Sequence, residues 1–198
     1  ILSIIFALSN CFNNQSKKTI SVSGAWALYP LMIKWAEEYQ KVYPDITINI
    51  SAGGAGKGMS DVLSQAVDIG MISREIFEIE IKKGAYSIPV AIDAVFPVIN
   101  KKNPVYKMIR LNGITIEELK ELWTKKNFGC LAEINKRFPS NIQYRIYTRS
   151  DACGAAKTWA SLFKKKQEDL IGIGIYGDPG LLEAVKKDSI GFGYNNLN

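Results

Sequence analysis

Four segments rich in glycine and other small residues recur along the chain, each where an expected strand runs into an expected helix. These segments are residues 24–30, 52–58, 72–75 and 149–155. Glycine and alanine let a ligand approach the backbone closely, and the first N–H groups of a helix have no partner within that helix. Such groups bind anions. The spacing therefore predicts that the fold gathers several helix starts around one small anion.

Strand-like and helix-like periods alternate regularly in the first half of the chain. Strands are expected at 19–23, 46–50 and 67–72. Between them we expect an amphipathic helix, with its apolar face between Leu28 and Tyr39, and a short helix at 59–66. This βαβαβ order predicts an α/β fold with a parallel sheet, which would bind its ligand along the carboxyl ends of the strands.

A long apolar stretch at residues 88–100 predicts a strand, which we take as the best candidate for a crossing between two lobes. After it the alternation begins again. The later expected elements are a helix at 116–122 capped by Thr115, a strand at 144–148, a helix at 155–163, a helix from the turn at 177–180 through Val185, and a returning strand at 189–194. We expect hinge closure around residues 89–100 and 189–194.

The composition argues against most enzyme chemistry. The 198 residues include no histidine, which removes the commonest general base and most zinc or copper ligand sets. The glycine run around Lys57 departs from a nucleotide P-loop, because Gly58 stands where Ser or Thr should bind magnesium. We therefore expect no catalytic residue, metal or cofactor. The net charge of +6 suits an anionic ligand, whereas Lys164–Lys166 indicates a solvated helix face rather than a nucleic-acid site.

The first eighteen residues have the features of a secretion signal remnant followed by a tether. Apolar residues run to Asn10, and a polar stretch follows Cys11. The apolar run is too short to span a bilayer, and the Leu-Ser-Asn-Cys ending resembles a bacterial lipoprotein cleavage box. We therefore expect lipidation of Cys11, with an ordinary buried strand or helix as the alternative. We also expect both ends of the chain to be truncated.

The two remaining cysteines are interpreted separately. Cys153 lies at an expected helix start, which should lower the pKa of its thiol. Since no histidine can serve as its base, we interpret it as a thiol that lines the ligand site rather than as a nucleophile. Cys130 and Cys153 could pair in an oxidising compartment, but we expect them to stay unpaired.

Five motifs, in this order, carry a resemblance to a known family. They are Ser-Gly-Ala-Trp-Ala-Leu-Tyr-Pro at 23–30, Gly-Gly-Ala-Gly-Lys-Gly at 53–58, Asp-Ile-Gly-Met-Ile-Ser-Arg-Glu at 68–75, Thr-Arg-Ser-Asp-Ala-Cys-Gly-Ala at 148–155 and Asp-Ser-Ile-Gly-Phe-Gly-Tyr at 188–194. Together they resemble the phosphate-binding proteins of bacterial phosphate ABC transporters. The resemblance implies a two-lobed periplasmic-binding-protein fold, in which each lobe is a mainly parallel sheet flanked by helices and the ligand lies in the interlobe cleft.

The resemblance also implies a set of ligand contacts from both lobes. The implied residues are Ala25, Trp26, Gly54, Ala55, Gly56, Ser73 and Arg74 in the first lobe, and Arg149, Asp151, Cys153, Gly154 and Ala155 in the second. Arg149 would make a charge-assisted contact. Asp151 would accept the proton of phosphate and so exclude sulfate, or alternatively it caps a helix. Both arginines have an alternative role in surface or interlobe ion pairs, and Trp26 an alternative role in the core.

Hydroxyl donors are the main departure from the family pattern. The family commonly has Ser or Thr at the positions of Ala25, Ala55, Cys153 and Ala155, so backbone N–H groups or water would have to replace them. We expect a monomeric, extracytoplasmic binding protein, periplasmic or on the cell surface, that captures inorganic phosphate for an ABC transporter permease. It would have no enzymatic activity, no nucleic-acid partner and no membrane contact beyond its lipid anchor. The alternative is a binding protein or sensor for another small oxyanion or a phosphorylated ligand.

The expected division of the chain follows from the same reading. Residues 1–18 would form the signal remnant and tether, residues 19–91 together with 189–198 the first lobe, and residues 92–188 the second lobe.

Overall fold

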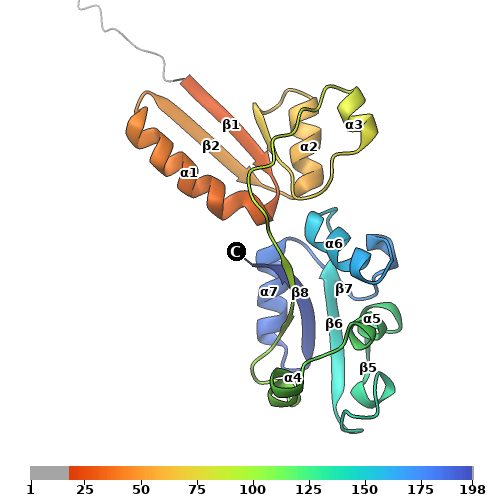
Figure 1. Ribbon diagram of the computed structural model, residues 1–198. Helices are drawn as coiled ribbons and strands as arrows, with labels where there is room; N and C mark the ends of the chain where they lie inside the picture. Colours follow the sequence, from red (N-terminus) through yellow and green to blue (C-terminus); the bar gives the residue numbers. More distant parts are fainter. Residues whose placement is uncertain (1–17, 198) are drawn as a thin grey trace, which may run out of the picture.

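The computed structural model describes residues 18–197, which form two lobes, each built on its own sheet (Figure 1). Residues 1–17 and 198 lie outside the described part of the chain, and so does the predicted lipidation site, Cys11. Within residues 18–197, no helix combines the length and the apolar composition that a membrane crossing requires.

The first lobe has a three-stranded sheet in the order β2-β1-β3, and both pairings are parallel. Its strands are β1 (Lys18–Gly24), β2 (Ile46–Ala52) and β3 (Ile69–Met71). Its helices are α1 (Tyr29–Val42), α2 (Ala55–Leu63) and α3 (Glu78–Lys82), and a 3-10 turn at Trp26–Leu28 precedes α1. The predicted βαβαβ order and parallel sheet are confirmed.

The entry into α2 differs from the prediction in a way that glycine explains. The helix begins at Ala55, whereas the sequence pattern predicted a start at Met59. Gly54, which precedes α2, has φ 92, in the left-handed region that glycine occupies readily. Because of this turn, the chain passes from β2 into α2 almost at once, and the start of α2 lies at the carboxyl edge of the sheet.

The second lobe has a five-stranded, parallel-rich mixed sheet. Four strands run in the order β4-β8-β6-β5, and β7 pairs with β6. β4 and β5 are antiparallel to their neighbours, whereas β6 is parallel to both β7 and β8. The strands are β4 (Val95–Ile99), β5 (Phe128–Cys130), β6 (Gln143–Arg149), β7 (Ile173–Ile175) and β8 (Gly191–Asn196).

Helices cover this second sheet (Figure 1). They are α4 (Tyr106–Asn112), α5 (Ile116–Thr124), α6 (Gly154–Leu162) and α7 (Asp178–Lys187), with 3-10 turns at Leu131–Glu133 and Gln167–Asp169. Thr115 caps α5 as predicted, since its side chain accepts a hydrogen bond of 3.2 Å from the N–H of Glu118. The predicted helices after β5 are confirmed within a few residues at each end.

The two lobes differ in how large a core they bury. An aromatic cluster fills the second lobe, where the Trp159 and Tyr194 rings stack with centroids 5.4 Å apart and Trp123 packs edge-on against Trp159 at 5.1 Å. The fully buried core of the first lobe is smaller and includes Val22 and Met71. Aromatic side chains dominate core energetics, so the second lobe holds the main hydrophobic core.

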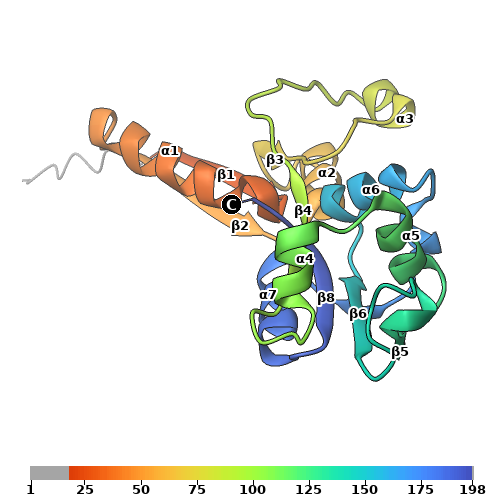
Figure 2. The same ribbon diagram turned by 60° about the horizontal axis from the view of Figure 1, so that its bottom comes forward.

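The prediction of one long strand at 88–100 is only partly correct, because the strand covers Val95–Ile99 alone. The preceding residues connect α3 to β4 without regular structure, and Figure 2 shows them as the link between the lobes. Ile88, Val90 and Ile92 are 69%, 51% and 102% exposed. Pairing of β4 with β8 stops at this point, since the last backbone contact on this edge is from Leu197 N–H to the Ala94 carbonyl at 3.1 Å.

The expected return of residues 189–198 to the first lobe is wrong for the described residues. β8 pairs with β4 on one side and with β6 on the other, so it lies inside the second sheet. Phe192 and Tyr194 of β8 are buried in the second lobe's core. This burial and the double pairing hold the strand there.

Candidate ligand-binding site

The first lobe's half of the predicted site is a backbone-rich surface at the carboxyl end of its sheet. Gly24, the last residue of β1, has φ 139, and its carbonyl accepts hydrogen bonds of 2.9 Å from the N–H groups of both Gly53 and Gly54. A Cβ on Gly24 would lie 2.2 Å from the Met71 carbonyl oxygen, so no larger residue fits there. Ala25 and Ala55 are buried beside this junction.

Lys57 does not present a free charge to this surface. Its ammonium group forms an ion pair with Asp61, which also accepts a 2.5 Å hydrogen bond from the buried Ser23 hydroxyl. These two hydrogen bonds, that from Lys57 first, lower the pKa of Asp61. The cluster therefore fixes the base of the glycine loop from within the first lobe.

Arg74 and Ser73 follow β3. Ser73 lies against Gly154 of the second lobe, whereas the Arg74 side chain is bound within the first lobe. The Arg74 guanidinium donates to both carboxylate oxygens of Glu80 in α3, at 2.9 and 2.6 Å, and stacks 4.3 Å from the centroid of the Phe77 ring. The hydrogen bonds from Arg74 hold the pKa of Glu80 below its usual range. This is the ion-pair role that the sequence left open for Arg74, and its predicted ligand contact stays a prediction.

The second lobe's half centres on Arg149, whose side chain is 1% exposed. Its Nε and Nη2 donate to the two carboxylate oxygens of Asp151 at 2.8 and 2.5 Å, and its Nη1 donates to Asp178. The Gly177 N–H donates to Asp151 at 3.1 Å, and Asn196 donates to Asp178 at 2.9 Å. Burial raises the pKa of Asp178, and Arg149 opposes that rise. Arg149 is thus held rigidly between two carboxylates.

Cys153 forms the N-cap of α6 and is buried. Its sulfur accepts a 3.5 Å hydrogen bond from the Ala156 N–H, and its own N–H donates to the Gln167 side chain at 3.4 Å. The predicted lowering of its pKa is wrong: burial raises the pKa of Cys153 to about 11, and the Arg149 charge offsets only part of that rise. Cys153 and Cys130 are both free thiols.

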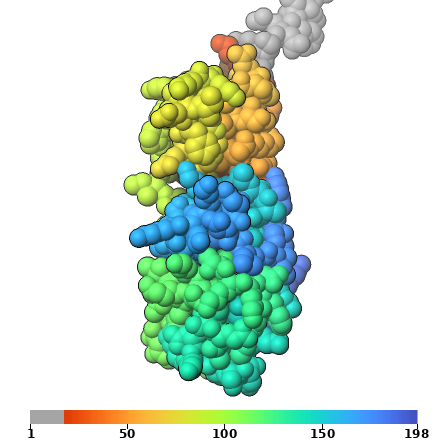
Figure 3. All heavy atoms as spheres, turned by 90° about the vertical axis from the view of Figure 1, so that its right-hand side faces the viewer, coloured from red at the N-terminus to blue at the C-terminus, as the bar shows by residue number. Residues whose placement is uncertain are grey.

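The two halves meet directly, and glycines lie at each close approach. A Cβ on Gly154 would lie 1.7 Å from the Ser73 carbonyl oxygen, and one on Gly54 would lie 3.0 Å from the Asp151 carboxylate. Gly56, in the first turn of α2, has Ala152 at 3.6 Å from its Cβ position. Figure 3 shows the contact between lobes, with the cyan and blue surface around α6 beneath the yellow surface of the first lobe. The starts of α2 and α6 therefore share one junction.

Two further contacts connect the lobes beside this junction. The Tyr176 hydroxyl donates to the Gly53 carbonyl at 3.2 Å, and Lys157 pairs with Glu75 at 3.1 Å. The Trp26 ring lies 3.2 Å from the Cβ position of Gly177 and meets the Tyr176 ring edge-on at 6.4 Å. Trp26 therefore packs between the lobes rather than only within the first.

Nine of the twelve predicted residues lie at this junction or in its immediate supports: Ala25, Trp26, Gly54, Ala55, Gly56, Ser73, Arg149, Asp151 and Gly154. Cys153 and Ala155 lie at the start of α6, but their side chains are buried in the core of the second lobe. The Arg74 side chain is held by Glu80 of α3. Sequence reasoning missed Tyr176 and Asp178. Their signal was present in the Tyr-Gly-Asp-Pro-Gly turn at 176–180, which opens α7 just as the other small-residue segments open their helices.

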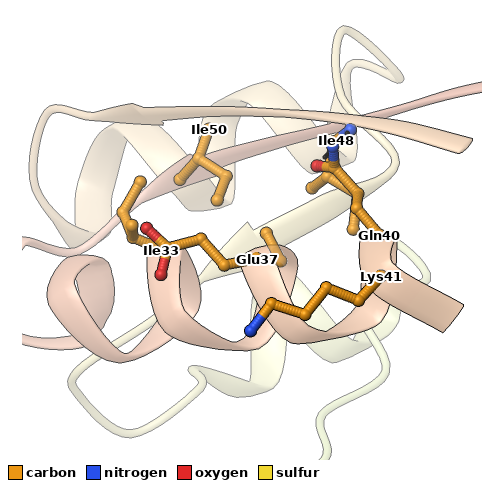
Figure 4. Close-up of a pocket in the computed structure, with 7 residues that line it drawn as sticks. Ile33, Glu37, Gln40, Lys41, Ile48 and Ile50 are labelled. Carbon is orange, nitrogen blue, oxygen red and sulfur yellow. Dashed lines mark hydrogen bonds between the residues drawn. The ribbon is translucent and has the colours of Figure 1, made fainter. Parts of the chain in front are cut away.

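Surface hollows elsewhere involve none of the predicted site residues. One is an apolar groove between α1 and β2, lined by Ile33, Ile48 and Ile50 with polar residues at its rim (Figure 4). Another lies between β4 and α7. Neither hollow is lined by a predicted ligand contact.

Comparison with known proteins agrees with this architecture. The family model described as the PBP superfamily domain matches residues 13–198. Phosphate-binding protein PstS 2 of Streptococcus agalactiae is 30% identical over 111 residues, which cover 56% of this chain and 36% of that protein. Protein SphX of Synechococcus elongatus is 27% identical over 191 residues, covering 91% of this chain and 55% of that protein.

A solved structure supports the fold across most of the chain. The putative phosphate ABC transporter substrate-binding protein from Clostridium perfringens, crystallised with bound phosphate, superposes with a TM-score of 0.78 at 22% identity, covering 91% of this chain and 71% of that one. The chain spans between about a third and just over half the length of the curated relatives named above. Because the family model covers nearly the whole sequence and the solved structure shares its fold, the chain belongs to the PBP superfamily domain family.

Proposed function

We propose that this protein is an extracytoplasmic solute-binding protein that captures inorganic phosphate and delivers it to an ABC transporter permease. The observation that carries the proposal is the junction where the starts of α2 and α6, from different lobes, approach each other within ordinary contact distance. Helix N-termini attract anions through their unpartnered N–H groups and their dipoles. Relatives named as phosphate-binding proteins support phosphate as the anion.

The proposed contacts divide between the lobes. From the first lobe, Ala55 and Gly56 would donate backbone N–H groups and Ser73 would add a hydroxyl, while Gly54 would let the ligand approach the backbone closely, since its own N–H is bonded to the Gly24 carbonyl. From the second lobe, Gly154 and Ala155 would donate backbone N–H groups, and Arg149 would add a guanidinium N–H. Ligand contacts made by both lobes at once stabilise the closed arrangement over the open one.

The mode of action proposed here is binding without chemistry. We also propose that the protein acts as a monomer anchored through a lipid at Cys11, and that the permease recognises the closed form. These parts of the proposal rest on the sequence and on the family, and each has its own test: mass spectrometry for the lipid and sedimentation for the monomer.

Calorimetric titration tests the binding proposal. Phosphate, sulfate, molybdate and a phosphate monoester are titrated in parallel at one ionic strength into the unlipidated protein. We expect micromolar or tighter binding of phosphate and none of sulfate. Silence with phosphate and heat from another of these ligands would overturn phosphate as the substrate.

A further inference from the structure

The two carboxylates that bind the Arg149 side chain carry more negative charge than its guanidinium carries positive charge. Asp151 binds it through two hydrogen bonds and Asp178 through a third. The side chains of Arg149, Asp151 and Asp178 are 1%, 8% and 5% exposed, so water screens them little. Together these three side chains carry one positive and two negative charges.

Asp178 borders the junction between the lobes. It is the first residue of α7, directly after Gly177, whose N–H donates to Asp151 and whose Cβ position contacts Trp26 of the first lobe. Its second carboxylate oxygen accepts from Asn196 at 2.9 Å, which fixes the carboxylate in place. An anion bound at the start of α6 would therefore meet the negative charge of a buried Asp-Arg-Asp group.

Other charged groups near this junction add no positive charge to it. Lys57 is paired with Asp61, Arg74 with Glu80, and Lys157 with Glu75. The titratable groups that interact electrostatically with Asp178 include Arg149, Asp151, Asp93 and Cys153. The buried side chains behind the site are therefore net negative. The site must bind an anion mainly through N–H groups.

We propose that Asp178 is a specificity-determining residue that makes the site favour the singly charged form of phosphate, H2PO4−, over the doubly charged form, HPO4 2−. This inference rests on the proposed function. A carboxylate repels a dianion about twice as strongly as a monoanion at the same distance. H2PO4− has two O–H groups that can donate to carboxylates, HPO4 2− has one, and sulfate has none.

The test compares the wild type with Asp178→Asn, which removes the charge and nearly preserves the shape. Phosphate is titrated calorimetrically one pH unit below and one above its second pKa, and sulfate at both pH values. We expect the wild type to bind phosphate more weakly at the higher pH. We expect Asp178→Asn to gain about tenfold or more at the higher pH, to gain less at the lower pH, and to bind sulfate.

The matched control is Asp188→Asn, since Asp188 pairs with Arg145 at 2.8 Å in the same lobe without a contact to the predicted site. It should keep the wild-type pH profile. An unchanged profile in Asp178→Asn, or weaker binding at both pH values, would overturn the inference while leaving phosphate binding intact. If Asp178→Asn does not fold, the wild type decides: a phosphate affinity that is flat or rises with pH overturns the inference. Absence of any phosphate binding in the wild type overturns the proposed function itself.

Discussion

Replacing Gly154 with alanine should prevent closure of the lobes while the protein stays folded. The added Cβ would lie 1.7 Å from the Ser73 carbonyl oxygen, 2.5 Å from the carbonyl carbon and 2.6 Å from Oγ. Two of these three atoms are backbone, so a change of the Ser73 rotamer cannot relieve the clash. Gly154 is the first residue of α6, and alanine is itself a good helix former, so the substitution does not act by breaking the helix.

The expected loss of affinity follows from the size of that clash. An ordinary contact lies at 3.4–4 Å, so the nearest separation must at least double before the methyl group fits. Hydrogen bonds weaken steeply when they are lengthened by that much. If the ligand loses two charge-assisted hydrogen bonds, each contributing about 1.5–3 kcal/mol, its affinity falls by about a hundredfold or more.

Calorimetry with phosphate measures the affinity, and small-angle X-ray scattering with and without phosphate measures closure. Gly180→Ala is the matched control, because Gly180 also lies in the first turn of a helix, and its Cβ would meet only a side-chain methyl group, the Cγ2 of Ile175, at 3.1 Å. Wild-type affinity in Gly154→Ala, with a wild-type scattering change, would refute the argument.

Three further variants test the interactions that position the site. Arg149→Ala leaves two buried carboxylates without their cation and should lower the free energy of unfolding by about 3–5 kcal/mol in urea titration; an unchanged midpoint would contradict this. Arg74 lowers the pKa of Glu80 in the folded protein below its value in the unfolded chain. The ion pair therefore stabilises the folded protein fully at pH values above the unfolded-state pKa, and this stabilisation is lost as the pH falls through the folded-state pKa. Glu80→Gln should therefore lower the free energy of unfolding at neutral pH and lower it much less at acidic pH. An equal decrease at both pH values would rule out the ion pair as the cause. Thr115→Ala removes the hydroxyl that accepts from the Glu118 N–H and should cost about 0.5–2 kcal/mol by thermal unfolding, with no loss arguing that water replaces the cap.

Local patterns were enough to predict the strands of the first lobe, its helices α1 and α2, and the convergence of the small-residue segments. Strand ends in a parallel sheet meet at one edge, so the segments ending in Gly24 and Gly54 had to lie together. The predictions that went wrong depended on tertiary partners. Residues 88–92 have the composition of a strand, but pairing on that edge stops at Ala94.

The electrostatics of the site also could not be predicted from local sequence patterns. A helix start lowers a thiol pKa, yet the Cys153 thiol is buried, and desolvation outweighs the helix. Asp178 is 29 residues from Arg149 in the sequence, so the second carboxylate on that arginine follows only from the fold. Glu80, by contrast, is close to Arg74 in sequence, but the short helix that brings it back was not predicted.

Titration of the 15N-labelled protein with phosphate, followed by backbone amide NMR, tests the central claim most directly. The account predicts that the amide signals of Gly54, Ala55, Gly154 and Ala155 shift together along one saturating curve, while those of α4 and α5 stay in place. No shifts at either helix start, or shifts confined to the groove between α1 and β2, would contradict it.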